Sequence, residues 1–588
     1  MAITELLLFF HHDTMGILDI MKPQRAENGA FMKKHYEKIL WDCDLWVSQV
    51  IHFQVTDPSS EFYGGFRDHD GLVEPKYAIF QVTNMTASFL NSQSRYYGSK
   101  DIYRRITIAL DYIRKGQREN GFFDLINCNF YSGADTAFCL DGLLPAYLYV
   151  KRLLENEIES PVQMDLLVPL KDTMEAILIK GGKAMIGSGF HTPNHRWAIA
   201  SVLQMLTSIT GNESFQKGAE VFMVEFCDCN EDGEYAERSA GGYNLVNNNA
   251  MIMLALATGD DSYYEPVKRN LNMMLTYIEP DQSIFTNNST RQDRGVKVYP
   301  VGYYLEYLYM GIIFENETFL KAACSIMNIA EEKQISMEGF LIHFMLMPRL
   351  LEFEYETCGL LTNYCRYYKD SGIVRLRRGD YSASILNGSP TFLFFQHGDF
   401  SVSMKIGASF CEHRYFTGQS LTSVSETGGF QLKETKTGWY YLPFDEPQDT
   451  TDWWKMDHSK RDKLYGPDMI FNIVIEEAEN GIDVKIKTEG IDRAPLRVEL
   501  AFDGGCRLES EHFIAEGVKG GGMVAKDGTV TATKGKYAIT AGPGFWEHNY
   551  VAGKFGSQNR SSECFTVYFT DFTCFEHTIS LRAVPADY

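Results

Sequence analysis

The sequence lacks an apolar run long enough to cross a bilayer, which takes about 20 residues as a helix. Its most apolar N-terminal stretch, residues 6–10, reads Leu-Leu-Leu-Phe-Phe, but an acidic residue precedes it and no basic segment does. Secretory signal peptides begin with a basic segment. We therefore expect a cytoplasmic protein without a membrane partner, and we treat residues 1–30 as a poorly ordered N-terminal extension.

An excess of positive charge is also missing. The 588 residues include 77 acidic and 55 basic side chains, a formal net charge of −22. Such a balance argues against a broad surface for nucleic acid or for anionic membranes. It leaves room for a local basic cleft that binds an acidic polymer.

A cysteine metal motif is absent as well. The twelve cysteines are scattered, and the closest pair, Cys227 and Cys229, has no second pair at zinc spacing. We expect reduced, mostly buried thiols in a reducing compartment. No cofactor is expected to be required, and a structural metal in the C-terminal third would lack a compact ligand motif.

Apolar residues with helical spacing fill most of the chain from residue 31 to residue 351. Trp41, Leu45, Trp46, Ile51 and Phe53 mark a first long helix. The pattern predicts further helices at 74–92, 101–117, 134–156, 164–180, 193–210, 213–226, 240–258, 261–278, 299–314, 317–332 and 336–351.

Loops with glycine or serine beside an aromatic residue recur before alternate helices, for example at 62–66, 120–124 and 187–190. Their spacing corresponds to one helical hairpin. About a dozen helices in repeated hairpins predict an incomplete α/α barrel, or (α/α) toroid, over residues 31–371, with the loops gathered on one face.

Short alternating segments replace the helical pattern near residue 372. The segments beginning at Thr391, Ile482, Leu496 and Phe565 are typical of strands. Asn480-Gly481 and Asp527-Gly528 are sequences that favour hairpin turns. Residues 372–588 are therefore predicted to form an antiparallel β-sandwich.

Two predicted helix starts carry reactive side chains. Thr192 is a natural N-cap and Pro193 a natural first helical residue, which puts Asn194, His195 and Arg196 in the first turn. Unpaired N–H groups and the helix dipole favour a bound anion there.

At the second start, Ser239 is the candidate N-cap, so Tyr243 lies near a helix mouth. An amide, an imidazole and a phenol suit β-elimination on a uronic acid, which needs a donor to the carboxylate, a base for the C5 proton and an acid for the leaving oxygen.

With Asn194-His195 followed by Tyr243 49 residues later, after an acidic glycine-containing loop, the chain resembles the heparinase II/III-like and alginate-lyase-like polysaccharide lyases. Those enzymes usually carry Asn-Asn-His-Gly, where this chain has Pro-Asn-His-Arg, and Arg238 stands where Gln is common. The resemblance implies that Asn194 neutralises the carboxylate, His195 is the candidate base, and Tyr243 is the acid or the combined acid and base. It implies an acidic oligo- or polysaccharide as substrate.

Further side chains on the predicted loop face would contact such a substrate, because guanidinium groups pair with carboxylates and aromatic rings stack on sugars. The substrate-binding candidates are Arg67, His69, Tyr131, Asp135, His191, Arg196, Glu237, Arg238, Arg291, Arg294 and, in the sandwich, His413. Loop ion pairs are the plainer interpretation of each one taken singly.

Two other functions remain open. The same toroid could carry a glycoside hydrolase of the glucuronidase or unsaturated-uronyl hydrolase type, with an acid and a base drawn from Asp68, Asp70, Asp135, Glu234 and Glu237. A glycan-binding protein without activity is the third alternative. Asn194 and His195 would then only cap a helix, and Tyr243 would pack between hairpins.

Overall fold

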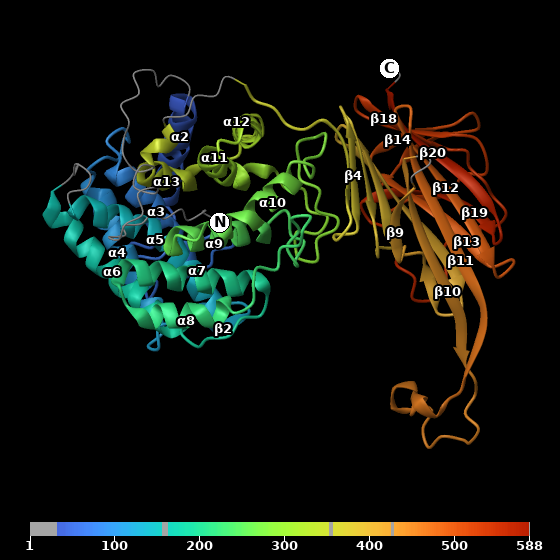
Figure 1. Cartoon of the computed structure of the whole chain (residues 1–588), viewed down its shortest axis with the longest axis horizontal. Coiled ribbons are helices and arrows are strands. Elements are labelled where there is room, and N and C mark those ends of the chain that lie inside the picture. The colour runs from blue at the N-terminus through green and yellow to red at the C-terminus, as the bar shows by residue number, and fades with distance from the viewer. Residues whose placement is uncertain (1–31, 156–162, 352–356, 425–427, 587–588) are drawn as a thin grey trace. The chain divides into compact units, whose positions relative to one another are not determined.

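The computed structural model describes residues 32–155, 163–351, 357–424 and 428–586, so the predicted extension at 1–30 lies outside the described residues. The chain divides into two compact units. One holds the described residues up to Ile278 together with Gln282–Leu360, and the other holds Glu279–Asp281 and the chain from Leu361 onward. Figure 1 shows the helices of the first unit and the strands of the second.

The first unit is built from α-helices. Their bounds are α2 (Met32–Val50), α3 (Pro75–Leu90), α4 (Lys100–Gly116), α5 (Gly133–Leu154), α6 (Met164–Met185), α7 (Pro193–Thr210), α8 (Glu213–Met223), α9 (Tyr243–Thr258), α10 (Tyr264–Met274), α11 (Tyr304–Ile313), α12 (Glu317–Glu332) and α13 (Leu341–Leu346). The 3-10 turns are η1 (Asp261–Tyr263), η2 (Pro300–Tyr303), η3 (Glu338–Phe340) and η4 (Pro348–Leu351), and β1 (Phe123–Leu125) pairs with β2 (Asn129–Ser132). The predicted helices at 193–210 and 317–332 match α7 and α12. The one predicted at 336–351 is instead broken into η3, α13 and η4, because the residue before Pro348 is disfavoured in a helix.

Alternate helices differ in burial, which places them in two layers. Most residues of α3, α5, α7 and α9 are buried, as expected of helices that are packed on all sides, whereas α4, α6 and α8 bury only one stripe. The buried helices contact one another in order, α3 with α5, α5 with α7 and α7 with α9, and α13 returns to contact α3. The predicted (α/α) toroid is confirmed.

The second unit is a β-sandwich of two large sheets. The first sheet has the order β15-β14-β17-β18-β20-β12-β11-β10-β9, and the second β16-β19-β13-β7-β6-β5-β4-β3, with β8 on β7. The strands are β3 (Asn363–Tyr368), β4 (Ile373–Arg378), β5 (Tyr381–Leu386), β6 (Thr391–His397), β7 (Phe400–Phe410), β8 (His413–Tyr415), β9 (Ser420–Val424), β10 (Gly429–Tyr441), β11 (Lys463–Ala478), β12 (Gly481–Gly490), β13 (Pro495–Asp503), β14 (Cys506–Glu509), β15 (Ile514–Gly517), β16 (Gly522–Val524), β17 (Val530–Lys534), β18 (Tyr537–Gly542), β19 (Cys564–Phe572) and β20 (Glu576–Pro585). Inward residues of both sheets, such as Phe395 and Phe471, form one core.

The sandwich departs from the prediction in its details. The turn at Asn480-Gly481 joins the paired strands β11 and β12, as predicted. The second predicted hairpin is wrong, because Asp527-Gly528 lies between β16 and β17, which belong to different sheets. The short β16 also pairs with β19 in parallel rather than antiparallel fashion. Strand β3 already precedes the predicted domain start at 372.

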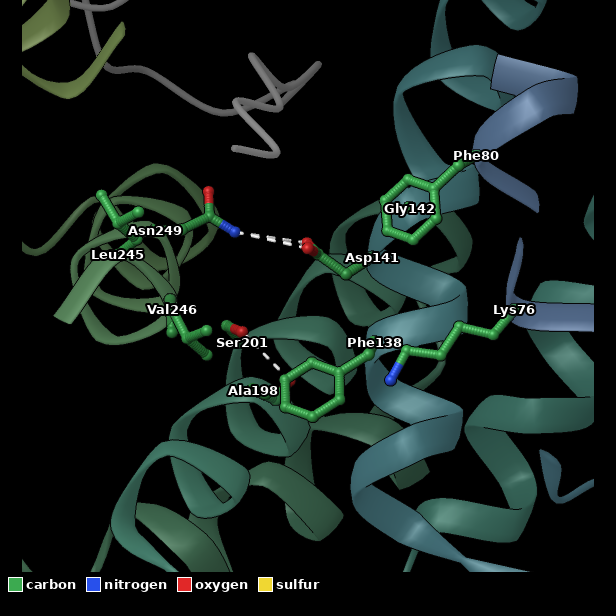
Figure 2. Close-up of a pocket in the computed structure, with 11 residues that line it drawn as sticks. Lys76, Phe80, Phe138, Asp141, Gly142, Ala198, Ser201, Leu245, Val246 and Asn249 are labelled. Atoms are coloured by element: carbon green, nitrogen blue, oxygen red, sulfur yellow. Dashed lines mark hydrogen bonds between the residues drawn. The ribbon is translucent and has the colours of Figure 1, made fainter. Parts of the chain in front are cut away.

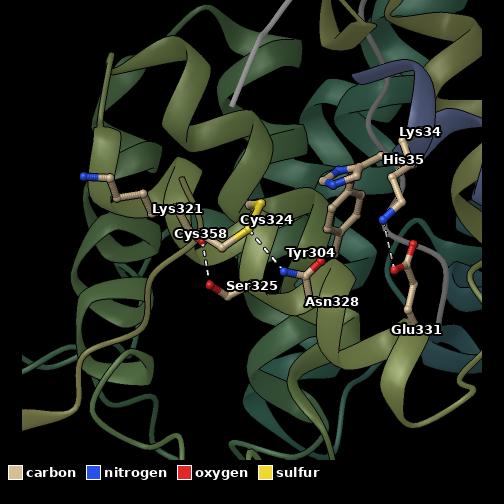
Figure 3. The surroundings of a disulfide bond; sticks show 9 residues. All are labelled: Lys34, His35, Tyr304, Lys321, Cys324, Ser325, Asn328, Glu331 and Cys358. Carbon is tan, nitrogen blue, oxygen red and sulfur yellow. Dashed lines mark hydrogen bonds and ion pairs between the residues drawn. A yellow bond between two sulfur atoms is a disulfide. The ribbon is translucent and has the colours of Figure 1, made fainter. Parts of the chain in front are cut away.

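The structure corrects the expectation for the cysteines at one pair. Cys324, buried on α12, is joined to the exposed Cys358 by a disulfide with a Cα–Cα distance of 5.1 Å (Figure 3). The two residues lie 34 positions apart, and sequence spacing alone does not determine such a pairing. Among the described residues, no helix is both long and apolar enough to span a bilayer.

Candidate active site

The site is built where the buried helices of the toroid begin. Helices α3, α5, α7 and α9 start at Pro75, Gly133, Pro193 and Tyr243. Side chains at these starts bond from α3 to α5 and from α7 to the segment before α9. Lys76 at the start of α3 donates to Asp135 at the start of α5, over 3.1 Å. The reactive residues predicted from sequence lie at the starts of α7 and α9.

Helix α7 begins as predicted, with Thr192 as N-cap and Pro193 as first residue. The side chain of Asn194 is fully buried. Its amide donates to Glu237 Oε2 over 2.6 Å and to Thr192 Oγ1 over 2.9 Å, and its backbone N–H donates to the same Glu237 oxygen over 3.1 Å. Asn194 therefore holds Glu237. The amide donors that were predicted to bind a substrate carboxylate are instead used within the protein.

Glu237 connects Asn194 to a third segment. Its other oxygen, Oε1, forms an ion pair with Arg291 Nε at 3.2 Å. The guanidinium of Arg291 in turn lies 5.0 Å from the centre of the Tyr243 ring. A continuous chain of contacts thus runs from Asn194 through Glu237 and Arg291 to Tyr243.

The start of α9 is fixed by a hydroxyl and a carboxylate. The prediction of Ser239 as N-cap is wrong, because α9 begins only at Tyr243 and its N-cap is Gly242. Ser239 Oγ still accepts the N–H of Tyr243 over 3.0 Å. Asp293 accepts from Ser239 Oγ and from the N–H of Gly241, each over 2.9 Å. The half-buried phenol of Tyr243 donates to Gln292 Oε1 over 3.3 Å.

His195 is half-buried beside this chain of contacts. Its ring packs edge-on against Phe138 at 5.9 Å and His191 at 6.0 Å, and its buried Nδ1 has no hydrogen-bond partner among the described residues. Burial lowers the pKa of His195 to about 4. Asp135 opposes this shift, and the cations Arg291 and Lys76 add to it. The imidazole is therefore uncharged at neutral pH and can accept a proton.

Asp135 and Lys76 are two further charged residues that act on His195. The buried Asp135 carboxylate also accepts from Asn129 Nδ2 over 3.2 Å and from Ser132 Oγ over 2.8 Å. Lys76 lies 5.0 Å from the Phe138 ring centre. A pocket adjoins Lys76 between α3, α5, α7 and α9, where Asn249 donates to Asp141 (Figure 2). Sequence reasoning missed Lys76, although Pro75-Lys76 repeats the proline-polar helix start of Pro193-Asn194.

Several predicted residues have partners away from His195. Arg196 is buried and donates to Phe222 O over 2.5 Å and to Glu225 Oε2 over 2.5 Å, so it does not point to a substrate. Arg238 is paired with the buried Glu234 at 3.3 Å. Tyr131 is exposed and stacks on Arg118 at 4.0 Å.

The remaining predicted residues lie at the surface of their own unit. Arg67, His69 and Arg294 are exposed in loops, with His69 beside Asp70 at 3.2 Å. In the β unit, His413 Nε2 lies 2.8 Å from Thr437 O. Among the described residues, no group of three or more His, Cys, Asp or Glu is arranged to hold a metal ion.

Neither a family model nor a curated protein matches the sequence. Solved structures do match. The Streptomyces coelicolor A3 chondroitin AC lyase, in complex with chondroitin sulphate, aligns with a TM-score of 0.53 at 9% identity, covering 97% of this chain and 82% of the lyase. A Paenibacillus xanthan lyase aligns with a TM-score of 0.52 at 10% identity, covering 95% of this chain.

The chain has the fold of polysaccharide lyases. It spans 59% of the length of the xanthan lyase chain. At these identities the likeness is one of fold, an α/α toroid followed by a β-sandwich. The predicted resemblance is confirmed at this level, and the starts of α7 and α9 carry the candidate chemistry.

Proposed function

We propose that the protein is a lyase that cleaves a uronic-acid-containing glycan by β-elimination. The observation that carries this proposal is the position of one uncharged imidazole among two cations and a phenol. Lys76 and Arg291 are close enough to His195 to influence its charge, and Arg291 also covers the Tyr243 ring. The fold shared with a chondroitin AC lyase and a xanthan lyase supports the same class of reaction.

The cations prepare the substrate for proton loss. The carboxylate of the uronic acid binds between Arg291 and Lys76, which offset the charge that develops when the C5–H bond breaks. The side chain of Arg291 keeps about a quarter of its surface exposed, at 27%, and that of Lys76 is 24% exposed. Both cations therefore remain accessible to an anion while held by Glu237 and Asp135.

His195 and Tyr243 carry the proton transfers. The neutral His195 ring takes the C5 proton, and the electron pair of the broken C–H bond forms the double bond between C4 and C5. The bond between C4 and O4 breaks, and the phenol of Tyr243 gives its proton to the leaving O4. The phenolate regains a proton from solvent, while the imidazolium releases one. The products are an unsaturated uronate and a new sugar hydroxyl.

Asn194 is a positioning residue in this scheme. Because its amide and its backbone N–H both bind Glu237, it fixes the carboxylate that holds Arg291 above Tyr243. Three of the five carboxylates from which a glycoside hydrolase would draw its acid and base are likewise engaged by cations. Asp135 is bound by Lys76, and Glu237 and Glu234 are bound by Arg291 and Arg238. This arrangement favours elimination over hydrolysis.

The test is the ultraviolet absorbance of the conjugated double bond on a panel of uronic-acid glycans, with reducing-end release measured in parallel. Wild-type protein should produce both signals, and Tyr243→Phe should lose both. New reducing ends without absorbance would replace elimination by hydrolysis. Tyr440→Phe, which alters an exposed phenol on β10 in the β unit, is the matched control and should retain both signals.

A further inference from the structure

A second cleft opens on the helical unit between α2, the first turns of α3 and the segment before α13. Trp46, Tyr77, Phe80 and Phe340 line it together with Gln81 and Glu338, and we call it the aromatic cleft. Its cavity volume is about 390 Å³. Ligand sites of small molecules occupy roughly 300–1,000 Å³, so the aromatic cleft has room for a sugar ring.

The side chains of the aromatic cleft match the surface of a sugar. Trp46 donates its indole N–H to Gln81 Oε1 over 2.7 Å, which fixes the ring plane on the cleft wall. A fixed aromatic plane offers a pyranose ring an apolar surface. The partly exposed carboxylate of Glu338 adds a hydrogen-bond acceptor for sugar hydroxyls, whereas the buried Gln81 serves to hold Trp46.

The charge of the aromatic cleft excludes an anion. Among its described lining residues, Glu338 is the only charged one. The pKa of Tyr77 is raised because the phenol is buried and because Asp68 and Glu338 place negative charge nearby. A sulfate or a carboxylate would meet repulsion here, whereas an uncharged sugar would not.

The aromatic cleft adjoins the candidate active site. Phe80 lines both the aromatic cleft and the pocket that contains Lys76 and Phe138 (Figure 2). Lys76 and Phe80 lie four residues apart on α3, which is about one helical turn, or ~5.4 Å. A sugar in the aromatic cleft would therefore be a near neighbour of a uronate held at Lys76.

We propose that the aromatic cleft is the subsite for an uncharged sugar next to the uronate, so that the substrate alternates uronic acid with an unsulfated neutral or N-acetylated sugar. This inference rests on the proposed function for the position of the uronate. It adds the chemical nature of the sugar next to the uronate. Trp46 would contact the face of that sugar, and Glu338 would disfavour a charged group on it.

The experiment compares unsulfated chondroitin with chondroitin 4-sulfate and 6-sulfate, in which the neighbouring sugar carries a bulky, charged sulfate. The Glu338→Gln variant separates the effect of charge from that of size. Binding to the Tyr243→Phe protein is measured by calorimetry and turnover of the wild type by absorbance. We expect the unsulfated polymer to be favoured about ten- to hundredfold in Kd and in kcat/KM. Glu338→Gln removes the negative charge and should reduce the preference for the unsulfated polymer in both Kd and kcat/KM.

Trp46→Ala should weaken binding about tenfold and raise KM with little change in kcat. Trp41→Ala is the matched control, because Trp41 lies on the same helix and is 66% exposed. Trp46→Phe retains an aromatic surface and should keep most of the affinity, which separates a lost contact from a misfolded helix.

The outcomes separate the two proposals. Selective, Trp46-dependent binding without double-bond formation would overturn the lyase and keep the aromatic cleft. Turnover of uronate glycans without preference for the unsulfated polymer, or with a preference that Glu338→Gln leaves unchanged, would overturn the aromatic cleft alone. Absence of both binding and turnover of unsulfated chondroitin would likewise overturn the proposal for the aromatic cleft.

Discussion

Two enclosed histidines, one in each unit, have opposite surroundings. His397 in the β unit is buried, with Nδ1 2.9 Å from the carbonyl of Ala538 and Nε2 3.5 Å from Asp380. His195 in the helical unit has a buried Nδ1 that finds no partner in the described part of the chain, and burial lowers the pKa of the ring to about 4. The first ring has partners within its own unit, and under the proposed function the second would find its partner in the substrate.

The same contrast extends to the neighbours of each ring. Buried Arg497 in the β unit is paired with Glu499 at 2.8 Å. Beside His195, the buried Oδ1 of Asn194 also lacks a partner among the described residues. Unsatisfied buried polar atoms cost stability. Such atoms also occur in the β unit, for example His458 Nδ1, so the distinguishing feature of Asn194 and His195 is that two of them are adjacent at one helix start.

The largest expected effect comes from exchanging each histidine for glutamine. His195→Gln removes the proposed base and should lower kcat by about 10²–10⁴-fold. His397→Gln disturbs a buried contact in the other unit and should lower the free energy of unfolding by about 1–3 kcal/mol while kcat is retained. Initial rates and denaturant unfolding of both variants provide the comparison.

Equal loss of activity in both variants would show that His195 has no special role. A thermal unfolding curve of His195→Gln close to that of wild type is the control for folding.

The second prediction concerns a charge pair that the β unit buries completely. Arg375 is fully buried and its Nη1 lies 2.9 Å from Glu279, which residues 279–281 contribute to this unit. Glu279→Ala leaves the guanidinium without its counter-charge and should cost about 3–5 kcal/mol of unfolding free energy. Denaturant titration measures the loss.

Glu477→Ala is the matched control. Glu477 pairs at 2.6 Å with Arg378, which lies on β4 as Arg375 does, but both side chains of this pair are partly exposed. It should cost less than about 1 kcal/mol. Similar losses in the two variants would contradict the importance of burial.

The third prediction tests the chain of contacts in the active site. Glu237→Gln keeps the shape of the side chain but removes the charge that pairs with Arg291. With Arg291 less firmly held over Tyr243, kcat should fall about ten- to hundredfold. Steady-state kinetics on the best glycan of the panel measure it.

Glu234→Gln provides the comparison, because Glu234 is equally buried in the same loop but pairs with Arg238. A loss of kcat in Glu234→Gln as large as that in Glu237→Gln would remove the distinction between the two carboxylates.

Much of the fold could be predicted from the sequence because the signals are local. Pro193 after Thr192 determines the start of α7, and the burial pattern of α12 follows its apolar period. Alternation along residues 482–487 predicts β12. The connection at Asp527-Gly528 was mispredicted, because pairing of β17 with β14 and β18 depends on strands distant in sequence.

The site could be predicted only in part for the same reason. Asn194, His195, Tyr243 and Arg291 were predicted as site residues from their types and positions. In the structure they lie near one another, through Glu237 and the charge of Arg291. The direction of each side chain was not readable. Arg196 turns to the carboxylate of Glu225 and to the carbonyls of Phe222 and Glu225 near the end of α8. Asn194 turns to Glu237. Lys76 was missed because its partner Asp135 lies 59 residues away.

The smallest expected effect is the shape of the pH profile. Because the pKa of His195 is about 4 rather than 6.5, the base remains deprotonated throughout the neutral and mildly acidic range. The acid limb of kcat/KM, which reports the free enzyme, should therefore lie near pH 4, with little change between pH 5 and 7 from this group. A limb near pH 6.5 would mean that His195 is solvated or that another histidine is the base.

Stability should follow the same group with a definite sign. His195 binds its proton less readily in the folded protein than in the unfolded chain, so between about pH 6.5 and pH 4 the unfolded state holds more protons and stability falls as the pH falls. His35, whose pKa burial also lowers to about 4, adds to this loss. His195→Gln should remove one part of the pH dependence of the unfolding free energy, and His35→Gln should remove the other part. In the first variant the acid limb of activity disappears with the base, whereas in the second it stays, because His35 bonds to Tyr304 and takes no part in the contacts of the site.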